Sequence, residues 1–474
     1  MASSLLHPHD DYAPFDVAVV GGGIVGLHVA LGLIKRGIPV TIYEQAHELK
    51  EIGAGMGFTS NVVDCMDAID PNVAESLDNV AIRSGGTVRW IDGLAREDLS
   101  SRPKERLFDV ELCLDEEAIT RTTHRGQFLN ELVKLLPPDQ IKLGKRLDTI
   151  VQSGENEKLL LKFSDGTTAK ADTGMNHPPS LYPLFPFVFQ EEANRHIPEA
   201  VIGCDGIKSC VRRLVLDKDD PAAVPHYAHE TAYRCLVDMD KALPAVGDLC
   251  KGMVMYMGQG AHLMAYPVDD FKSLNVAAFI HDDGEWPEGE KHTISGSKED
   301  IQKAYSNFGP TVRSLVALVP DELNRWAMFD TFDHPLPTYA YGRITLAGDA
   351  AHGSTPHFGA GAGMGVEDAL VLSSVLQQAA TKMRTHGVAV SKGRVLSAAF
   401  EAYDAVRRER SQWLVRSSRR QGQKVKGLDP EIGKDFDKFK EDTGAFMEQF
   451  FYYDFRAMLQ QATDEFERRV SGWI

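Results

Sequence analysis

The first fifty residues alternate between apolar and amphipathic stretches in the order strand, helix, strand. Residues 15–20 form a short valine-rich run of the kind found in buried parallel strands. The pattern over residues 24–34 predicts a helix, and residues 38–43 predict a second buried strand. A β-α-β unit of this kind opens a Rossmann-type fold.

The middle of the chain has a different pattern. Between about residues 225 and 335, short stretches alternate apolar and polar side chains, as strands with one buried face do. The clearest stretches are 231–237, 252–257, 261–268 and 274–280. They predict an antiparallel sheet with one face toward a cavity. After Gly427 the chain reads as helical and charged, and we interpret the aromatic residues 450–453 as packing or a subunit contact.

Composition narrows the function classes. The 474 residues include 51 Lys and Arg against 68 Asp and Glu, a net charge of −17, so we expect no nucleic-acid partner. No apolar segment predicts a signal peptide or a spanning helix, so we expect a cytoplasmic protein without a membrane partner. The six cysteines have no C-x-x-C spacing, and we predict neither a disulfide framework nor a metal site.

A glycine-rich turn follows the first predicted strand. Gly21, Gly23 and Gly26 fit G-x-G-x-x-G, in which glycines allow a tight turn and the close approach of a pyrophosphate. The next helix adds free N–H groups and its positive dipole end. Glu44 follows the second strand, where it can accept hydrogen bonds from an adenosine ribose. The set predicts a dinucleotide site without distinguishing NAD from FAD; a chance glycine cluster at a turn is the alternative.

A second glycine-rich segment lies more than three hundred residues later. Residues 345–349 predict a strand ending in Gly-Asp, and Asp349 is placed to bind a ribityl hydroxyl. Residues 357–365 are too glycine-rich for core packing, and we expect a helix to begin near Gly365. N–H groups at its amino end would stabilise negative charge on a reduced flavin ring. The two segments together favour FAD, with an ordinary glycine-rich loop as the alternative.

The chain resembles the class A flavoprotein aromatic monooxygenases over about residues 15–421. Three fingerprints carry the resemblance: Gly21–Gly26 with Glu44, Cys204–Arg212, and Gly348–His352. Segments similar to the salicylate hydroxylase-like branch, which includes fungal enzymes that hydroxylate or dearomatise polyketide phenols, are 44–46, 52–55, 123–125 and 359–369. The resemblance implies noncovalent FAD, O2, and NADPH or NADH as cosubstrate. Because the chain has one G-x-G-x-x-G, we expect the nicotinamide cofactor to bind transiently.

The resemblance also implies further cofactor contacts. Arg125, at the head of a helix expected over 126–136, and Gly57 should lie along FAD. Asp205 belongs to a motif that in the family touches both FAD and the nicotinamide cofactor, and Ala362 should lie against the flavin. Taken alone, Arg125 is also compatible with an exposed cation at a helix start and Asp205 with a turn after a strand.

Pattern and resemblance together predict an α/β fold: a Rossmann-type FAD-binding domain split around an antiparallel β-sheet substrate domain, with a helical C-terminus. The expected divisions are a disordered N-terminus (1–14), FAD-binding parts (15–215 and 336–425), a substrate sheet (216–335) and C-terminal helices (426–474). Residues 174–199 depart from the family pattern. This proline-rich insertion reads as a surface loop or as translated intron sequence.

Oxygen transfer to a phenol needs a cation or hydrogen-bond donors at the phenolate and apolar walls around the ring. By similarity to the dearomatising branch, Arg234 would hold the phenolate by charge-assisted hydrogen bonds and Tyr266 would orient it. Regular alternation would put Tyr233 and His229 on the opposite face. These two match another branch, in which such residues assist substrate deprotonation. The alternatives are sheet stabilisation for Tyr233 and Arg234, core packing for Tyr266, and a structural role for His352.

We therefore predict an FAD-dependent, NAD(P)H-consuming monooxygenase that hydroxylates a small phenolic substrate through a flavin C4a-hydroperoxide. Oxidative dearomatisation or decarboxylation in secondary metabolism stays open, as does a homodimer. One alternative is an FAD-dependent epoxidase or oxidase on the same scaffold; the W-x-W-x-I-P signature of related halogenases is absent from the sequence. A noncatalytic flavin-binding sensor is the alternative from another class.

Overall fold

The computed structural model describes residues 13–49, 55–84, 87–99, 110–113, 120–152, 154, 158–169, 198–269, 271–287, 291–386 and 391–473. The predicted disordered N-terminus (1–14) and the proline-rich insertion (174–199) lie almost wholly outside these residues. Glu199, at the end of the insertion, is described. It is buried and accepts a hydrogen bond from the backbone N–H of Asp16 (2.7 Å), so it belongs to the folded chain.

Three distant parts of the chain build one sheet. In the described residues its strand order is β18-β19-β11-β1-β2-β8, parallel throughout except for the pair β18–β19. β1 and β11 are buried at every position, as expected for central strands covered on both faces. The strands are β1 (Val17–Val20), β2 (Val40–Tyr43), β8 (Ile141–Lys142), β11 (Ala200–Gly203), β18 (Ala340–Tyr341) and β19 (Ile344–Leu346).

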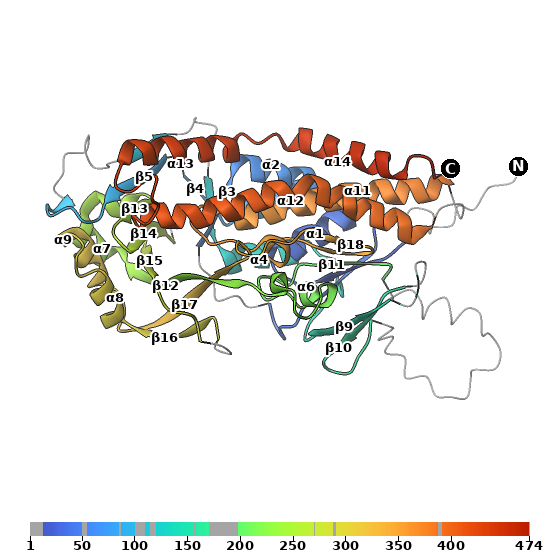
Figure 1. Cartoon of the computed structure of the whole chain (residues 1–474), viewed down its shortest axis with the longest axis horizontal. Helices are drawn as coiled ribbons and strands as arrows, with labels where there is room; N and C mark the ends of the chain where they lie inside the picture. Colours follow the sequence, from blue (N-terminus) through green and yellow to red (C-terminus); the bar gives the residue numbers. More distant parts are fainter. Residues whose placement is uncertain are drawn as a thin grey trace, which may run out of the picture.

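Helices from both ends of the chain share one apolar core with this sheet. Figure 1 shows α12 alongside α11, with α13 and α14 along the same edge of the molecule. The helices are α1 (Ile24–Lys35), α2 (Ser60–Ile69), α3 (Pro71–Asp78), α4 (Arg125–Lys134), α6 (Cys210–Val215), α10 (Asp349–His352), α11 (Gly361–His386), α12 (Lys392–Val425), α13 (Phe436–Phe451) and α14 (Phe455–Val470). None of the described helices is long and apolar enough to cross a membrane.

A second, mostly antiparallel sheet has eight strands in the described ranges, in the order β16-β17-β12-β15-β14-β13-β5-β6. Its edge strands β5 and β6 come from the first part of the chain, and β5 pairs in parallel with β13. The sheet is therefore larger than the predicted stretch 216–335. Its strands are β5 (Thr87–Asp92), β6 (Val110–Cys113), β12 (His226–Asp238), β13 (Val254–Met257), β14 (Ala261–Val268), β15 (Ser273–His281), β16 (Thr293–Ser297) and β17 (Glu322–Asp330).

The two faces of this eight-stranded sheet are covered differently. On one face, Tyr233, Val237 and Val276 join an apolar core with short helices. On the other face, the Tyr266 hydroxyl lies so close to Gly55 that a Cβ there would overlap it. The open face therefore meets the FAD-binding part. The covering helices are α7 (Met239–Val246), η5 (Gly247–Lys251), α8 (Lys298–Ala304) and α9 (Pro310–Val316); η4 (Pro221–Ala223) precedes β12.

Two smaller sheets complete the described elements. One has the order β3-β7-β4, with antiparallel pairing, and carries Gly55 on its first strand. The other is the hairpin β9–β10. Their strands are β3 (Gly55–Thr59), β4 (Ile82–Ser84), β7 (Thr120–His124), β9 (Leu147–Val151) and β10 (Leu160–Phe163). The small sheet of β3, β4 and β7 leads directly into α4, which begins at the residue after the end of β7.

Candidate functional site

The turn between β1 and α1 is shaped by its glycines. Gly21 has φ +107°, which L side chains rarely adopt, and a Cβ there would also meet the backbone of Cys204. A Cβ at Gly26 would overlap the carbonyl oxygen of Gly21. Gly23, the N-cap of α1, has open space on its Cβ side and no side-chain cap. The turn thus leaves helix N–H groups and room for an anion such as a pyrophosphate.

Glu44 closes this turn from the end of β2. Its Oε2 accepts a hydrogen bond from the N–H of Gly22 (2.7 Å), and its Oε1 accepts one from Ala46 (2.7 Å). A carboxylate offers about four acceptor positions, so two bonds leave capacity for ribose hydroxyls. The carboxylate therefore both fixes the glycine turn and remains available to a ligand beside it.

The second glycine segment lies directly beside the first. Gly348 has φ +60°, and a Cβ there would lie 2.9 Å from Cγ2 of Val25 on α1. A Cβ at Gly365 on α11 would overlap the same Val25 methyl group. Val25 thus fills the space that both glycines leave. Segments more than three hundred residues apart meet here, as the sequence predicted for a dinucleotide held at both ends.

Asp349 and the start of α11 lie next to each other. Asp349 is exposed, and a Cβ at Gly361 would lie 3.9 Å from its Oδ1. Helix α11 begins at Gly361, four residues before the position expected from the sequence, so Ala362 lies in its first turn. The carboxylate and the helix N-terminus fit a ribityl chain and an electron-rich ring edge. Together with the β1–α1 turn, these residues fit FAD.

The Asp-Gly turn after β11 is a structural support of this region. Asp205 accepts hydrogen bonds from Ser209 Oγ (2.5 Å) and from the N–H groups of Cys210 (2.6 Å) and Val211 (3.1 Å), at the start of α6. Fully buried Arg212 donates to the carbonyl oxygens of Ala350 (3.0 Å) and Ile207 (2.5 Å). The Asp205 turn is therefore tied to α10 and packs against Gly21.

A closed group of charges anchors α11 to α12. We call Glu367, Asp368, Arg407, Arg410 and His352 the Arg407 cluster; each is at most 8% exposed. Arg407 donates to Glu367 Oε2 (2.5 Å) and Asp368 Oδ1 (2.9 Å), and Asp368 Oδ2 accepts from the Gly348 N–H (2.9 Å). Burial alone would raise the pKa of Asp368, but the charges of His352 and Arg407 hold that pKa below its ordinary value. His352 is thus part of the support, as expected.

The predicted substrate residues Arg234 and Tyr266 lie on the same face of the large sheet. Arg234 pairs with Ala277, and Tyr266 pairs with Asn275 two residues away on the same strand. Burial lowers the pKa of Arg234 and raises that of Tyr266, and each pKa is also affected by the charge of the other residue. The two side chains therefore face one place.

The same place lies close to the start of α4. The charge of Arg125 further lowers the pKa of Arg234, so the two guanidinium groups are neighbours. Arg125 is exposed and follows His124, which pairs with Gly55 under the Tyr266 hydroxyl. Gly57, on the same strand β3, pairs with Thr122. The structure thus brings the implied cofactor residue Arg125 and the two substrate residues together.

The alternative pair, Tyr233 and His229, lies away from the place that Arg234 and Tyr266 face. Tyr233 packs beneath the covering helices, where burial raises its pKa to about 12. His229 interrupts β12 with φ +53°, and the register with β17 shifts between Tyr227 and Thr231. Its Nδ1 lies 3.1 Å from the carbonyl oxygen of Gly284. His229 therefore lies away from Arg234 and lines a cavity to which Arg234 does not contribute.

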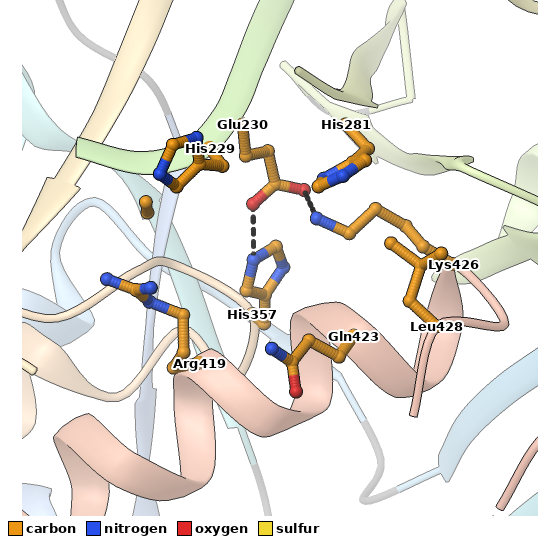
Figure 2. A pocket seen from close by; sticks show the side chains of 9 residues that line it. His229, Glu230, His281, His357, Arg419, Gln423, Lys426 and Leu428 are labelled. Carbon is orange, nitrogen blue, oxygen red and sulfur yellow. Dashed lines mark hydrogen bonds and ion pairs between the residues drawn. The ribbon is translucent and has the colours of Figure 1, made fainter. Parts of the chain in front are cut away.

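The cavity at His229, of about 310 Å³, was not predicted from the sequence (Figure 2). It is lined by Ala228, His229, Glu230, His281, His357, Arg419, Gln423, Lys426 and Leu428. Donor atoms of Glu230, His262 and His357 lie within 4.8 Å of one another, as metal ligands can. Lys426 Nζ, 2.7 Å from Glu230 Oε1, already balances this carboxylate. The group therefore fits an internal ion pair better than a divalent cation.

Comparison with known proteins places the whole chain in context. A family model described as FAD binding domain matches residues 190–418, and one described as FAD dependent oxidoreductase matches residues 16–62. The FAD-dependent monooxygenase pigN of Monascus ruber is 44% identical over 96% of this chain and 97% of its own length. Salicylate hydroxylase asL1 of Sarocladium schorii is 36% identical over 97% of this chain and 92% of its own.

Solved structures of flavin-dependent enzymes are also similar to this chain. A salicylate hydroxylase substrate complex is 26% identical, with a TM-score of 0.75 over 95% of this chain and 98% of that one. A structure of FqzB, 20% identical with a TM-score of 0.72, shares the fold over 97% of this chain and 95% of that one. These likenesses confirm the predicted α/β FAD-binding fold with a helical C-terminus.

Proposed function

Because the chain belongs to the FAD-dependent monooxygenases of the salicylate hydroxylase type, we propose that it hydroxylates a small phenolic substrate at the expense of NADPH or NADH. Membership makes the protein a monooxygenase and removes the noncatalytic sensor from consideration. The observation that supports a phenolic substrate is that Arg234 and Tyr266 lie on the same face of the large sheet.

The cofactor part of the proposal assigns roles to residues whose geometry fits FAD. Gly21, Gly23 and Gly26 would hold the pyrophosphate, with Glu44 on the adenosine ribose and Asp349 on the ribityl chain; Gly57, Arg125 and Ala362 would line the remaining length, and the Asp205 turn would support it. When bound and reduced, FAD activates O2 and supplies an electrophilic oxygen atom. The protein binds the cofactor, orients the substrate and excludes water.

The substrate part of the proposal rests on charge and shape. Arg234 would donate charge-assisted hydrogen bonds to a phenolate oxygen, since its guanidinium group stays cationic across the physiological range. Tyr266 would donate to the same oxygen and set the ring orientation. On the same face the sheet carries an apolar cluster of Ala232, Ala277 and Phe279, with Met264, Trp326 and Met328 packed against it, which would form an apolar wall beside the aromatic ring.

The guanidinium group also explains how the ring is activated. A phenol bound with its oxygen at Arg234 is more easily deprotonated, because the cation stabilises the phenolate. The negative charge spreads onto the ring carbons ortho and para to the oxygen, which then attack an electrophilic oxygen. Arg125, a second cation nearby, adds to the same field. Dearomatisation or decarboxylation would follow from the substituent on the attacked carbon.

The test is a coupled assay on the purified, FAD-loaded protein. Salicylates and resorcylic aldehydes are supplied with NADPH and, separately, with NADH, and cofactor oxidation is followed together with product mass. We expect substrate-stimulated oxidation of one nicotinamide cofactor and a product heavier by one oxygen atom. Oxidised product without added oxygen, or oxygen added to an alkene only, would favour the oxidase or epoxidase and contradict the phenol hydroxylase.

A further inference from the structure

A buried carboxylate joins the large sheet to the loop before α11 (Figure 2). Glu230 on β12 lies with its Oε2 2.8 Å from His357 Nε2 and its Oε1 2.7 Å from Lys426 Nζ. The three side chains are between 1% and 5% exposed. We call them, with the neighbouring His262, the Glu230 cluster. They come from three elements: a sheet strand, the loop before α11, and the end of α12.

Both ends of this contact lie close to proposed site residues. Glu230 precedes Arg234 by four residues on β12, and both face the same side because they pair regularly with β15. His357 precedes Gly361, the first residue of α11, by four residues. A displacement at either end therefore has a short path to the substrate face or to the helix start proposed for the flavin.

The local backbone is shaped for this contact. The left-handed φ of His229 and the register shift before Thr231 form an irregularity directly before Glu230. Irregularities of this kind redirect a side chain at the cost of local ladder pairing. On the opposite side, a Cβ at Gly422 of α12 would overlap His357 Nε2. The sequence thus leaves space for the histidine ring where it meets the carboxylate.

The Glu230 cluster is not a closed structural ion pair. It borders the cavity of about 310 Å³, and His357 Nδ1 and both ring nitrogens of His262 have no hydrogen-bond partner among the described residues. Buried polar atoms without partners are uncommon in folded proteins. Beside His357 the loop is held by neutral contacts, the hydrogen bonds of Thr355 with Ser418 and the stacking of Phe358 on Phe446, so the bond to Glu230 is its charged contact.

We propose that Glu230 is a positioning residue for the flavin-binding loop: its carboxylate holds His357 and so fixes residues 358–363 relative to Arg234. The inference rests on the proposed function, because the loop matters for catalysis only if α11 begins at the flavin. It assigns Glu230 no contact with substrate or cofactor. Burial alone would raise the pKa of Glu230, but the charges of His357 and Lys426 hold that pKa below its ordinary value. The cavity gives the loop room to move when the contact is lost.

The test compares Glu230→Gln with Asp330→Asn. Asp330 is a matched control because it is fully buried, pairs with Arg419 of α12 (2.6 Å), and has no bond to residues 354–363. Backbone hydrogen exchange over residues 354–364 is measured with and without FAD, together with the absorption spectrum and midpoint potential of bound FAD. We expect Glu230→Gln to speed exchange there by roughly tenfold and to shift the potential, because a neutral hydrogen bond replaces a charge-assisted one. Asp330→Asn should change neither.

Several results would overturn the proposal. One is a Glu230→Gln variant with unchanged exchange and potential; another is an equal change in Asp330→Asn, which would indicate a general loss of stability. If Glu230→Gln does not fold, His357→Leu removes the same contact from the loop side and must reproduce the change. A wild-type protein that takes up no FAD would instead reject the proposed function, while exchange in the FAD-free protein would still report on the pair.

Discussion

The FAD-binding part and the large sheet each contain a buried charge cluster, and the two clusters differ in one respect. In the Arg407 cluster, Glu367 and Asp368 accept several hydrogen bonds each, and both carboxylates are fully buried. In the Glu230 cluster, one carboxylate binds His357 and Lys426 beside a cavity, and three histidine nitrogens lack partners among the described residues, against one, His352 Nδ1, in the Arg407 cluster. The FAD-binding part is fixed, whereas the sheet meets its neighbour through an adjustable contact.

The difference follows from what each region must do. The FAD-binding part packs glycines against Val25 and carbonyl oxygens, so small displacements cause overlap. The sheet presents alanine and methionine side chains, which can adapt to different ring substituents. Substitutions in the FAD-binding part should therefore impair folding or FAD uptake as a whole. Substitutions on the large sheet should instead have graded effects on the fraction of NAD(P)H oxidation that is coupled to product formation.

The largest effect is expected from Arg407→Met. The substitution leaves Glu367 and Asp368 buried without their main cation, and breaking a buried pair typically costs about 3–5 kcal/mol. We expect a loss of this size in the free energy of unfolding, measured by urea denaturation. Arg408→Ala, next to it but on the surface with a pair to Asp404, is the control and should cost less than about 1 kcal/mol. Equal losses would contradict the special role of the closed cluster.

Two neighbouring glycines separate folding from cofactor binding. Gly26→Ala places a Cβ on the Gly21 carbonyl oxygen and should destabilise the fold by about 1–3 kcal/mol. Gly23→Ala meets no protein atom within 4 Å, so the fold should stay intact. Its methyl group would instead occupy the proposed pyrophosphate space, and FAD affinity should drop at least roughly tenfold. Calorimetry of FAD binding and thermal melts of the FAD-free proteins measure the two effects; tight FAD binding by Gly23→Ala would reject the cofactor placement.

Much of the FAD-binding part could be predicted from the sequence because its signals are local. A valine-rich strand, a glycine turn and an acid at the next strand end specify the β1–α1–β2 unit within thirty residues, and the start of α11 was missed by four residues because glycines weaken the helix signal. Arg234 and Tyr266 were chosen from the family resemblance rather than from the pattern, and the structure places them on one face of the large sheet.

The Glu230 cluster could not be predicted, for a physical reason. Its members lie 127 and 196 residues apart in the chain, and each looks ordinary alone. Alternation along β12 does give the face of Glu230, which pairs regularly with His281 of β15, but it does not show which residues of the loop before α11 and of α12 lie opposite that face. The burial of Arg407 could not be predicted either, because it depends on carboxylates of another helix. Contacts of this kind are set by tertiary packing, which local patterns do not encode.

The Glu230 cluster should make the free energy of unfolding depend on pH near neutrality, whereas the Arg407 cluster should not. Burial, with the charge of His357 acting in the same direction, holds the pKa of His262 well below the ordinary histidine value. The unfolded chain binds a proton there below about pH 6.5, and the folded protein does not. Stability should therefore fall as pH drops below about 6.5, by up to about 1.4 kcal/mol per pH unit from this group.

His262→Gln should remove that share of the slope, measured by urea denaturation between pH 7.5 and 5 at about half-unit steps. Buried His28, whose pKa burial lowers to about 4, contributes with the same sign and remains as a residual slope. His334→Gln, at an exposed position, gives the background. By contrast, the lowered pKa of Asp368 affects stability only as pH falls below about 4, since both states are ionised above it. An unchanged slope in His262→Gln would mean that this histidine is not held neutral.

The smallest effect is expected from Tyr266→Phe, which removes one hydroxyl from the adjustable region. The ring keeps its packing against Gly55, so folding and FAD content should match wild type. The proposed hydrogen bond to the phenolate is lost, which typically costs about 0.5–1.5 kcal/mol. Oxygenation should therefore continue with lower yield per NAD(P)H, more released peroxide, or a shifted position of hydroxylation.

Arg234→Ala is the matched variant on the same face: it removes the cation and should reduce coupling far more, again without loss of FAD. Product and peroxide are measured together on one phenol that the wild type converts. If both variants keep wild-type coupling and position, the substrate does not bind at this pair, and His229 and Tyr233 become the residues to test.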